Sequence, residues 1–187
     1  MAQLGASGKI LAMRILVTGG VRSGKSTHAE SLIGDEAATY VAAGPTPDAQ
    51  DDPDWTTRIA AHRARRPASW TTVETQDLAD AVRRAEQPVL IDCLGTWLTA
   101  LIDAAGAWEQ DADVVHGLVV GRTDELVAAV RECEHHVVVV TNEVGLGVIP
   151  EHRSGRLFRD LLGTVNQRVA AACDEVHLVV AGRVLRL

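Results

Sequence analysis

The stretch GGVRSGKS at residues 19–26 constrains the fold more than any other part of the sequence. It matches the phosphate-loop (Walker A) pattern G-x-x-x-x-G-K-[ST], and it lies between an apolar run at 14–18 and a helical pattern at 25–33. In this context the glycines let the backbone turn several N–H groups toward phosphate oxygens, and the helix N-terminus adds partial positive charge. The sequence therefore predicts a nucleotide-binding α/β protein in preference to a glycine-rich turn that binds nothing.

Polar side chains at the ends of apolar strands extend this prediction. Lys25 is expected to reach the β- and γ-phosphates of a nucleotide, and Ser26 is expected to bind Mg²⁺ through its hydroxyl. Asp92 ends the apolar run VLID, where a carboxylate either holds Mg²⁺ or caps the following helix. Asn142 and Glu143 end another apolar strand at the same expected edge of the sheet, and their roles are left open.

Strand-like and helix-like patterns alternate along the chain. Strands are expected at residues 14–18, 39–44, 70–75, 88–94 and 136–145 and as a β-hairpin within 175–187, and helices at 25–33, 56–65, 78–85, 112–132 and 154–173. This alternation predicts a mostly parallel sheet flanked by helices, with a polar, proline-rich loop after residue 44. The length fits one catalytic domain at 14–187, with residues 1–13 as a disordered extension unless Met13 is the natural start.

Composition argues against several classes of protein. The formal net charge of −7 does not suit broad nucleic-acid binding, which needs a basic surface. No apolar run approaches the length of a membrane span, and no secretory signal is visible. The three cysteines, Cys93, Cys133 and Cys173, are widely spaced and form no CxxC pair. We therefore expect buried thiols in a cytoplasmic protein.

A basic cluster stands out in this acidic chain. The stretch RIAAHRARRPASW surrounds His62 with four arginines: Arg58, Arg63, Arg65 and Arg66. A solvated helix face is the ordinary interpretation, but the density of positive charge favours a second site for an anion. Nearby arginines disfavour the imidazolium, so they keep His62 neutral and nucleophilic, and they can neutralise a departing pyrophosphate. A nucleotidyl-histidine intermediate is chemically possible at this position.

Four segments together resemble one enzyme family. They are ILVTGGVRSGKSTHAESLIG, the RIAAHRARRPASW stretch, VLIDCLGTWLT, and the long segment from VVVVTNEVGLGVIP to DEVHLVVAG. The chain resembles the bifunctional adenosylcobinamide kinase / adenosylcobinamide-phosphate guanylyltransferases of cobalamin (vitamin B12) biosynthesis, from about residue 14 to 182. The resemblance implies a RecA-like P-loop fold, phosphorylation of adenosylcobinamide with ATP or GTP, and transfer of GMP from GTP to give adenosyl-GDP-cobinamide. It also implies a homotrimer.

The resemblance implies roles for individual residues. His62 is the catalytic residue that carries the guanylyl group, and Mg²⁺ is held by Ser26 and Asp92. We further expect Glu74 to bind the guanine base, because a carboxylate can accept from both the N1–H and the 2-amino group. The nucleotide-binding residues are Gly19, Gly20, Val21, Arg22, Ser23, Gly24, Lys25, Ser26, Ala42, Ala43, Gly44, Arg63, Ala64, Arg65, Arg66, Glu74 and Asp92. The other histidines are read as surface or packing residues: His28, His116, His135, His136, His152 and His177.

Two alternative functions stay open on the sequence. A P-loop kinase for a small hydroxylated substrate, without guanylyltransferase activity, would leave His62 structural and would release nucleoside diphosphate but never pyrophosphate. A nucleotide-dependent switch would bind GTP without turning over a small molecule, although the chain has no second domain for a switch to drive. The donor of the phosphoryl group and the residues that bind the corrinoid are not identified by these motifs.

Overall fold

The computed structural model describes residues 12–44 and 53–187, and its strands form one seven-stranded sheet. The strand order is β3-β2-β4-β5-β1-β6-β7, and every neighbouring pair is parallel except β6 and β7. The strands are β1 Arg14–Gly19, β2 Thr39–Ala42, β3 Thr71–Glu74, β4 Val89–Asp92, β5 Val137–Val140, β6 Glu175–Val180 and β7 Arg183–Arg186. The expected mostly parallel sheet with a C-terminal β-hairpin is confirmed. Most of the expected N-terminal extension and of the loop after residue 44 lies outside the described residues.

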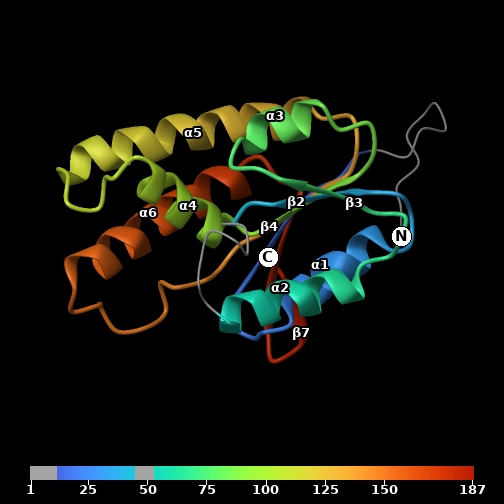
Figure 1. The fold of residues 1–187 in the computed structure, drawn as a ribbon, viewed down its shortest axis with the longest axis horizontal. Coiled ribbons are helices and arrows are strands. Elements are labelled where there is room, and N and C mark those ends of the chain that lie inside the picture. The colour runs from blue at the N-terminus through green and yellow to red at the C-terminus, as the bar shows by residue number, and fades with distance from the viewer. Residues whose placement is uncertain (1–11, 45–52) are drawn as a thin grey trace.

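In the described ranges, helices α1 to α6 cover the two faces of the sheet (Figure 1). They are α1 Lys25–Ile33, α2 Pro53–Arg65, α3 Leu78–Arg83, α4 Leu94–Ala104, α5 Ala112–Glu132 and α6 Arg153–Ala170. Helices α3 to α6 pack together on one side, and α1 and α2 lie on the other. No helix among the described residues is long and apolar enough to cross a membrane.

The central strands form the core because both of their faces are covered. All four valines of β5 are buried, which explains why the strand reads as a continuous apolar run without alternation. The larger core cluster lies under α3 to α6 and includes Trp97 and Leu126, and the smaller one lies under α1 and includes Tyr40 and Trp70. The sheet is therefore a rigid support whose strand ends can carry functional groups.

Helix α4 was not expected from the sequence. Its segment, LGTWLTALIDA, is apolar on most sides and follows strand β4 after one residue, so its pattern merges with the strand. Its N-cap is Cys93, which makes no side-chain capping hydrogen bond, so the usual start signal of a helix is missing. Asp92 does not cap this helix, and the capping alternative for that carboxylate is wrong.

Candidate active site

The carboxyl ends of the six parallel strands, β1 to β6, lie along one edge of the sheet. In the register of the sheet, Ala42 of β2 lies beside Glu74 of β3 on one side and Asp92 of β4 on the other, and Asp92 lies beside Val140 of β5. Neighbouring strands are about 4.8 Å apart, so the Cα atoms of Glu74 and Asp92, two strands apart, are separated by roughly 10 Å. Residues distant in the sequence are thereby brought to one crevice.

The phosphate loop follows β1 at the same edge. Gly24 adopts a positive φ of 95° at the start of α1, a conformation that glycine adopts without strain. A Cβ on Gly19 would lie 2.4 Å from the Val179 carbonyl oxygen, so this position has no room for a side chain. The Lys25 ammonium is largely buried and donates to the carbonyl of Gly20 at 3.3 Å, within the loop that it is expected to serve.

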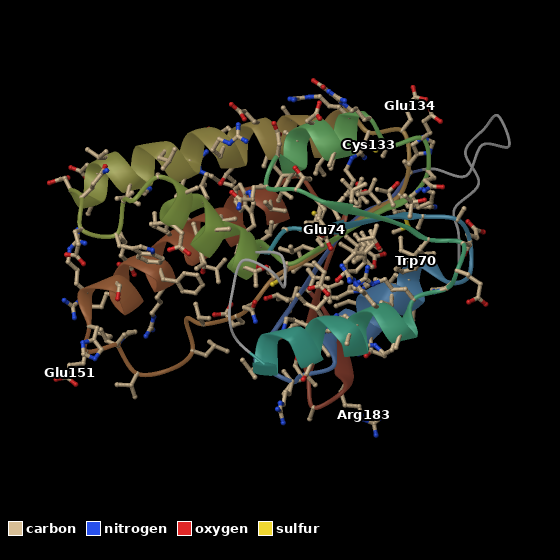
Figure 2. The ribbon with its side chains drawn as sticks, viewed as in Figure 1. Trp70, Glu74, Cys133, Glu134, Glu151 and Arg183 are labelled. Atoms are coloured by element: carbon tan, nitrogen blue, oxygen red, sulfur yellow. The ribbon has the colours of Figure 1, made fainter. Side chains whose placement is uncertain are left out.

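The C-terminal hairpin contacts the phosphate loop through its turn. The Gly182 N–H in the hairpin turn donates to the Ser23 carbonyl at 2.8 Å. Ala181 and Gly182 both have positive φ, which suits the tight turn between β6 and β7. The hairpin, whose Arg183 lies at the lower edge of the molecule in Figure 2, thus has a structural role next to the phosphate loop.

A pocket of about 210 Å³ joins the loop to the arginine-rich helix. Its lining includes Lys25 and Ser26 at the start of α1, His62 of α2, and Glu74 and Asp92 at the ends of β3 and β4. Glu74, at the end of the edge strand β3, lies near the middle of the view in Figure 2. The lining residues are Val21, Lys25, Ser26, Tyr40, Ala42, Gly44, Ile59, His62, Arg63, Arg66, Thr72, Glu74, Asp92, Cys93, Thr96 and Asn142.

His62 lies on the last turns of α2, and its side chain is about a quarter exposed. Burial lowers the pKa of His62, Arg65 and Arg66 lower it further, and the carboxylates of Asp92 and Glu30 oppose the shift. The direction agrees with the sequence-based prediction of a neutral imidazole. The cause differs, because burial contributes more than the arginines do.

The three described arginines of the cluster have different partners. Arg63 forms an ion pair with Glu74 across the pocket. Arg65 instead forms two hydrogen bonds to Glu30 of α1, and its side chain does not line the pocket. The Arg66 guanidinium lies 3.5 Å over the centroid of the Tyr40 ring and donates to the Thr72 hydroxyl at 2.8 Å. The side chain of Arg58 is outside the described part of the chain.

Asp92 and Asn142 are both held in place at the strand ends. The Tyr40 hydroxyl donates to Asp92 Oδ2 at 3.2 Å, and burial is the main reason that the pKa of Tyr40 is raised. Asn166 of α6 donates to the Asn142 carbonyl at 3.1 Å, and the Cys93 thiol donates to Asn142 Oδ1 at 3.5 Å. Burial raises the pKa of Cys93, so this cysteine is a hydrogen-bond donor in the pocket and not a thiolate nucleophile.

Most of the residues singled out in the sequence therefore meet in one pocket. Of the expected nucleotide-binding set, the ones that line it are Val21, Lys25, Ser26, Ala42, Gly44, Arg63, Arg66, Glu74 and Asp92. Ala64 and Arg65 lie outside the lining, as does Ala43, which is fully buried. The other expected loop residues do not line the pocket with their side chains: Gly19, Gly20, Arg22, Ser23 and Gly24. Arg22 has a positive φ of 55° in the loop backbone.

Sequence reasoning missed several lining residues. Tyr40 lies two positions before Ala42 on β2, so the two share a face of the sheet, and that alternation was a usable signal. Cys93 and Thr96 belong to the start of α4, which the pattern did not separate from the strand. Thr72 lines the pocket from the edge strand β3, two positions before Glu74, so the same alternation could have distinguished it from Thr71.

The donor set at the strand ends suits a hard cation. Ser26 offers a hydroxyl and Asp92 a carboxylate in the same pocket, and these oxygen ligands match the preferences of Mg²⁺. Asp92 Oδ1 makes no hydrogen bond within the described residues, so one oxygen is available. No cluster of three or more His, Cys, Asp or Glu side chains suited to a metal occurs in the described ranges. The residues therefore fit a cation that is completed by phosphate oxygens and water.

Comparison with known structures supports the fold. A prototypical ATPase from the type III secretion system of pathogenic bacteria superposes with a TM-score of 0.57 at 11% identity. The match covers 91% of this chain and 51% of that chain, so the present chain spans about half the length of the ATPase. At this identity the likeness shows a shared P-loop architecture and nothing about the reaction.

Comparison of sequences identifies the family. A family model described as cobinamide kinase / cobinamide phosphate guanyltransferase matches residues 15–187. The bifunctional adenosylcobalamin biosynthesis protein CobU of Salmonella typhimurium is 46% identical over 180 residues, covering 91% of this chain and 97% of that protein. CobU of Escherichia coli is 44% identical with the same coverages, and CobP of Pseudomonas aeruginosa is 36% identical, covering 91% and 94%. The chain belongs to the cobinamide kinase / cobinamide phosphate guanyltransferase family.

Proposed function

We propose that this protein carries out both reactions of its family. It phosphorylates the hydroxyl of adenosylcobinamide with ATP or GTP, and it then transfers GMP from GTP to that phosphate. The observation that carries the proposal is the single pocket shared by the phosphate-loop residues Lys25 and Ser26 and the histidine His62. A kinase needs only the loop, whereas a nucleophilic side chain within reach of the same nucleotide serves a second chemistry.

The nucleotide is bound by its phosphates and by its base. The backbone of residues 19–26 and the Lys25 ammonium receive the β- and γ-phosphates. Glu74 lies in the pocket and accepts from the guanine N1–H and 2-amino groups, while its ion pair with Arg63 fixes the carboxylate. Ser26 and Asp92 would hold Mg²⁺, which neutralises phosphate charge when it is bound.

In the guanylyl step, His62 attacks the α-phosphorus of GTP. The lone pair of the ring forms a nitrogen–phosphorus bond, and the bond to the bridging oxygen breaks as pyrophosphate departs with its electron pair. Arg66 lines the pocket and offsets the negative charge of the leaving group. The phosphate of cobinamide phosphate then attacks the same phosphorus and returns the electron pair to the imidazole. Two displacements at one phosphorus replace a single harder transfer.

The assembled protein and its place in the cell belong to the same proposal. We propose a homotrimer, as family resemblance implies, with one P-loop domain at residues 14–187 in each subunit. The corrinoid is larger than a pocket of about 210 Å³, so most of it must bind outside that pocket. The free thiols of Cys93, Cys133 and Cys173 suit a reducing, cytoplasmic location.

The test is an analysis of products from purified protein and adenosylcobinamide. Incubation with ATP and Mg²⁺ should give a product heavier by one phosphoryl group. Subsequent addition of GTP should release pyrophosphate and give adenosyl-GDP-cobinamide. Phosphorylation without pyrophosphate release would favour the kinase-only alternative, and nucleotide binding with neither product would favour a switch.

A further inference from the structure

The two ring nitrogens of His62 have different surroundings. Nδ1 lies 3.6 Å from Asp92 Oδ2 and 3.4 Å from an Nη2 donor of Arg65. Nε2 makes no hydrogen bond to any residue in the described ranges, and the ring lines the pocket. Both neighbours therefore approach the same nitrogen, and within the described ranges no residue occupies the other one, which faces a pocket suited to a substrate.

Asp92 is fixed where it meets the histidine. Its side chain is only 8% exposed, and its Oδ2 accepts from the Tyr40 hydroxyl at 3.2 Å. The Tyr40 ring is held by the Arg66 guanidinium at 3.5 Å from its centroid and by the Trp70 ring, whose centroid lies 6.4 Å away at an interplanar angle of 27°. The carboxylate therefore has little freedom to turn away from His62.

Arg65 is the competing neighbour, and it is fixed as well. Glu30 of α1 accepts from Arg65 Nη2 at 3.1 Å and from Nε at 3.2 Å, so the charge of the guanidinium is paired. A guanidinium can only donate hydrogen bonds, whereas a carboxylate can only accept them. Arg65 would therefore favour a bare Nδ1, and Asp92 favours a protonated one.

We propose that Asp92, positioned by Tyr40, accepts a hydrogen bond from the Nδ1–H of His62 and thereby makes Nε2 the nitrogen that carries the guanylyl group. This inference rests on the function proposed above. The Nε2 lone pair forms the bond to the α-phosphorus, pyrophosphate leaves with the electrons of the broken phosphorus–oxygen bond, and the proton stays on Nδ1. The ring becomes a cation during the attack, and Asp92 lies on the side where this charge is stabilised.

Glu30 is the second positioning residue in this arrangement. A positive ring next to an unpaired guanidinium would be disfavoured, because like charges at this separation repel. The ion pair with Glu30 reduces that repulsion without entering the pocket. The helix that follows the phosphate loop therefore also adjusts the surroundings of the nucleophile.

The decisive experiment identifies the modified nitrogen. Protein labelled with ¹⁵N in its histidine rings is incubated with GTP and Mg²⁺ and denatured in alkali, where phosphoramidates persist, and the phosphorus–nitrogen coupling is measured by NMR. The expected result is attachment at Nε2. Attachment at Nδ1 would overturn this inference while leaving the guanylyltransferase function intact. Absence of any phosphorylated ring, with GTP still bound, would overturn the function and the inference together.

Two variants test the positioning residues. Tyr40→Phe keeps the ring but removes the hydroxyl, so labelling at saturating GTP should slow roughly tenfold, while the dissociation constant of GTP stays within about twofold. Some label should also appear at Nδ1. Glu30→Gln should slow labelling in the same way, and Glu132→Gln, an exposed carboxylate at the end of α5, is the matched control with an unchanged rate.

A wild-type labelling rate with attachment only at Nε2 in both Tyr40→Phe and Glu30→Gln would overturn the roles given to these two residues. If Tyr40→Phe does not fold, as judged by thermal unfolding, the nitrogen assignment on the wild-type protein still decides the inference.

Discussion

At the scale of single residues, His62 illustrates how burial prepares a nucleophile. A histidine at the surface has a pKa of about 6.5. Partial burial lowers the pKa of His62, two arginines act in the same direction, and two carboxylates act against it. The neutral form that attacks phosphorus is therefore the dominant form at neutral pH, before any nucleotide binds.

This gives a prediction for the free protein. The His62 ring resonance, assigned by its loss in His62→Ala, should titrate with a midpoint below 6.5 in an NMR pH series. The sign follows because burial penalises the charged imidazolium, so a lower pH is needed to protonate the ring. A midpoint for His62 at or above about 6.5 would contradict the account.

Individual residues also show how much of the candidate site could be predicted from the sequence. The motif singled out Lys25 and Ser26, which both line the pocket, because the phosphate loop combines a fixed spacing with a fixed strand–loop–helix context. Arg65 appeared equivalent to Arg63 in the sequence, but its position on α2 directs it to Glu30. A pattern along one segment cannot show which residue of another segment a side chain contacts. These contacts distinguish Arg63 and Arg66, which line the pocket, from Arg65, which pairs with Glu30 outside it.

At the scale of elements, the phosphate loop depends on close contact with the strand β6. Replacing Gly19 with alanine would place a Cβ 2.4 Å from the Val179 carbonyl oxygen and 2.7 Å from the Ser23 hydroxyl, whereas a Cβ on Gly20 would meet nothing within 4 Å. Gly19→Ala should lower the free energy of unfolding by roughly 1–3 kcal/mol. Gly20→Ala should change it by less than about 1 kcal/mol.

Urea denaturation of the two variants beside wild type measures both values. Gly19→Ala should also lose GTP affinity, because the backbone must shift to relieve the collision. Equal stability of the two variants would show that the contact between the loop and β6 does not constrain this position.

A chain of side chains joins α1 to the hairpin. His28 Nε2 lies 2.9 Å from Nδ1 of the fully buried His177, and His177 Nε2 lies 2.7 Å from Glu175 Oε2. A single proton arrangement satisfies both contacts: His177 donates to the Glu175 carboxylate, and His28 donates to His177. The sequence analysis interpreted both histidines as surface or packing residues, and the contact between them was not visible in the sequence.

Replacing His177, the middle residue of this chain, should therefore destabilise the fold. His177→Ala leaves a cavity and removes the hydrogen-bond partner of both His28 and Glu175, so the free energy of unfolding should fall by about 2–4 kcal/mol. His116→Ala, at an exposed site on α5, should change it by less than about 0.5 kcal/mol. Urea denaturation at neutral pH measures both, and a similar small change in the two variants would mean that the chain contributes little to stability.

At the scale of the whole molecule, the sequence led to the architecture because strand and helix periods alternate clearly. The central strands β1, β4 and β5 are short apolar runs bounded by polar residues, and α5 and α6 carry long amphipathic patterns. Helix α4 was not predicted because its apolar residues continue from β4 without a capping signal. The order of the strands and their register, which bring Glu74 and Asp92 to either side of Ala42, are long-range properties that no local pattern contains.

The central claim concerns the whole molecule, since the pocket is assembled from the phosphate loop, α2 and the ends of several strands. The most direct test is covalent labelling with GTP that carries radiolabel at the α-phosphate, in the presence of Mg²⁺, with wild type beside His62→Ala. The account predicts an acid-labile, alkali-stable label on the wild-type protein and none on His62→Ala, while both proteins still bind GTP. Label on both proteins, or on neither while both bind GTP, would contradict the claim that His62 carries the guanylyl group.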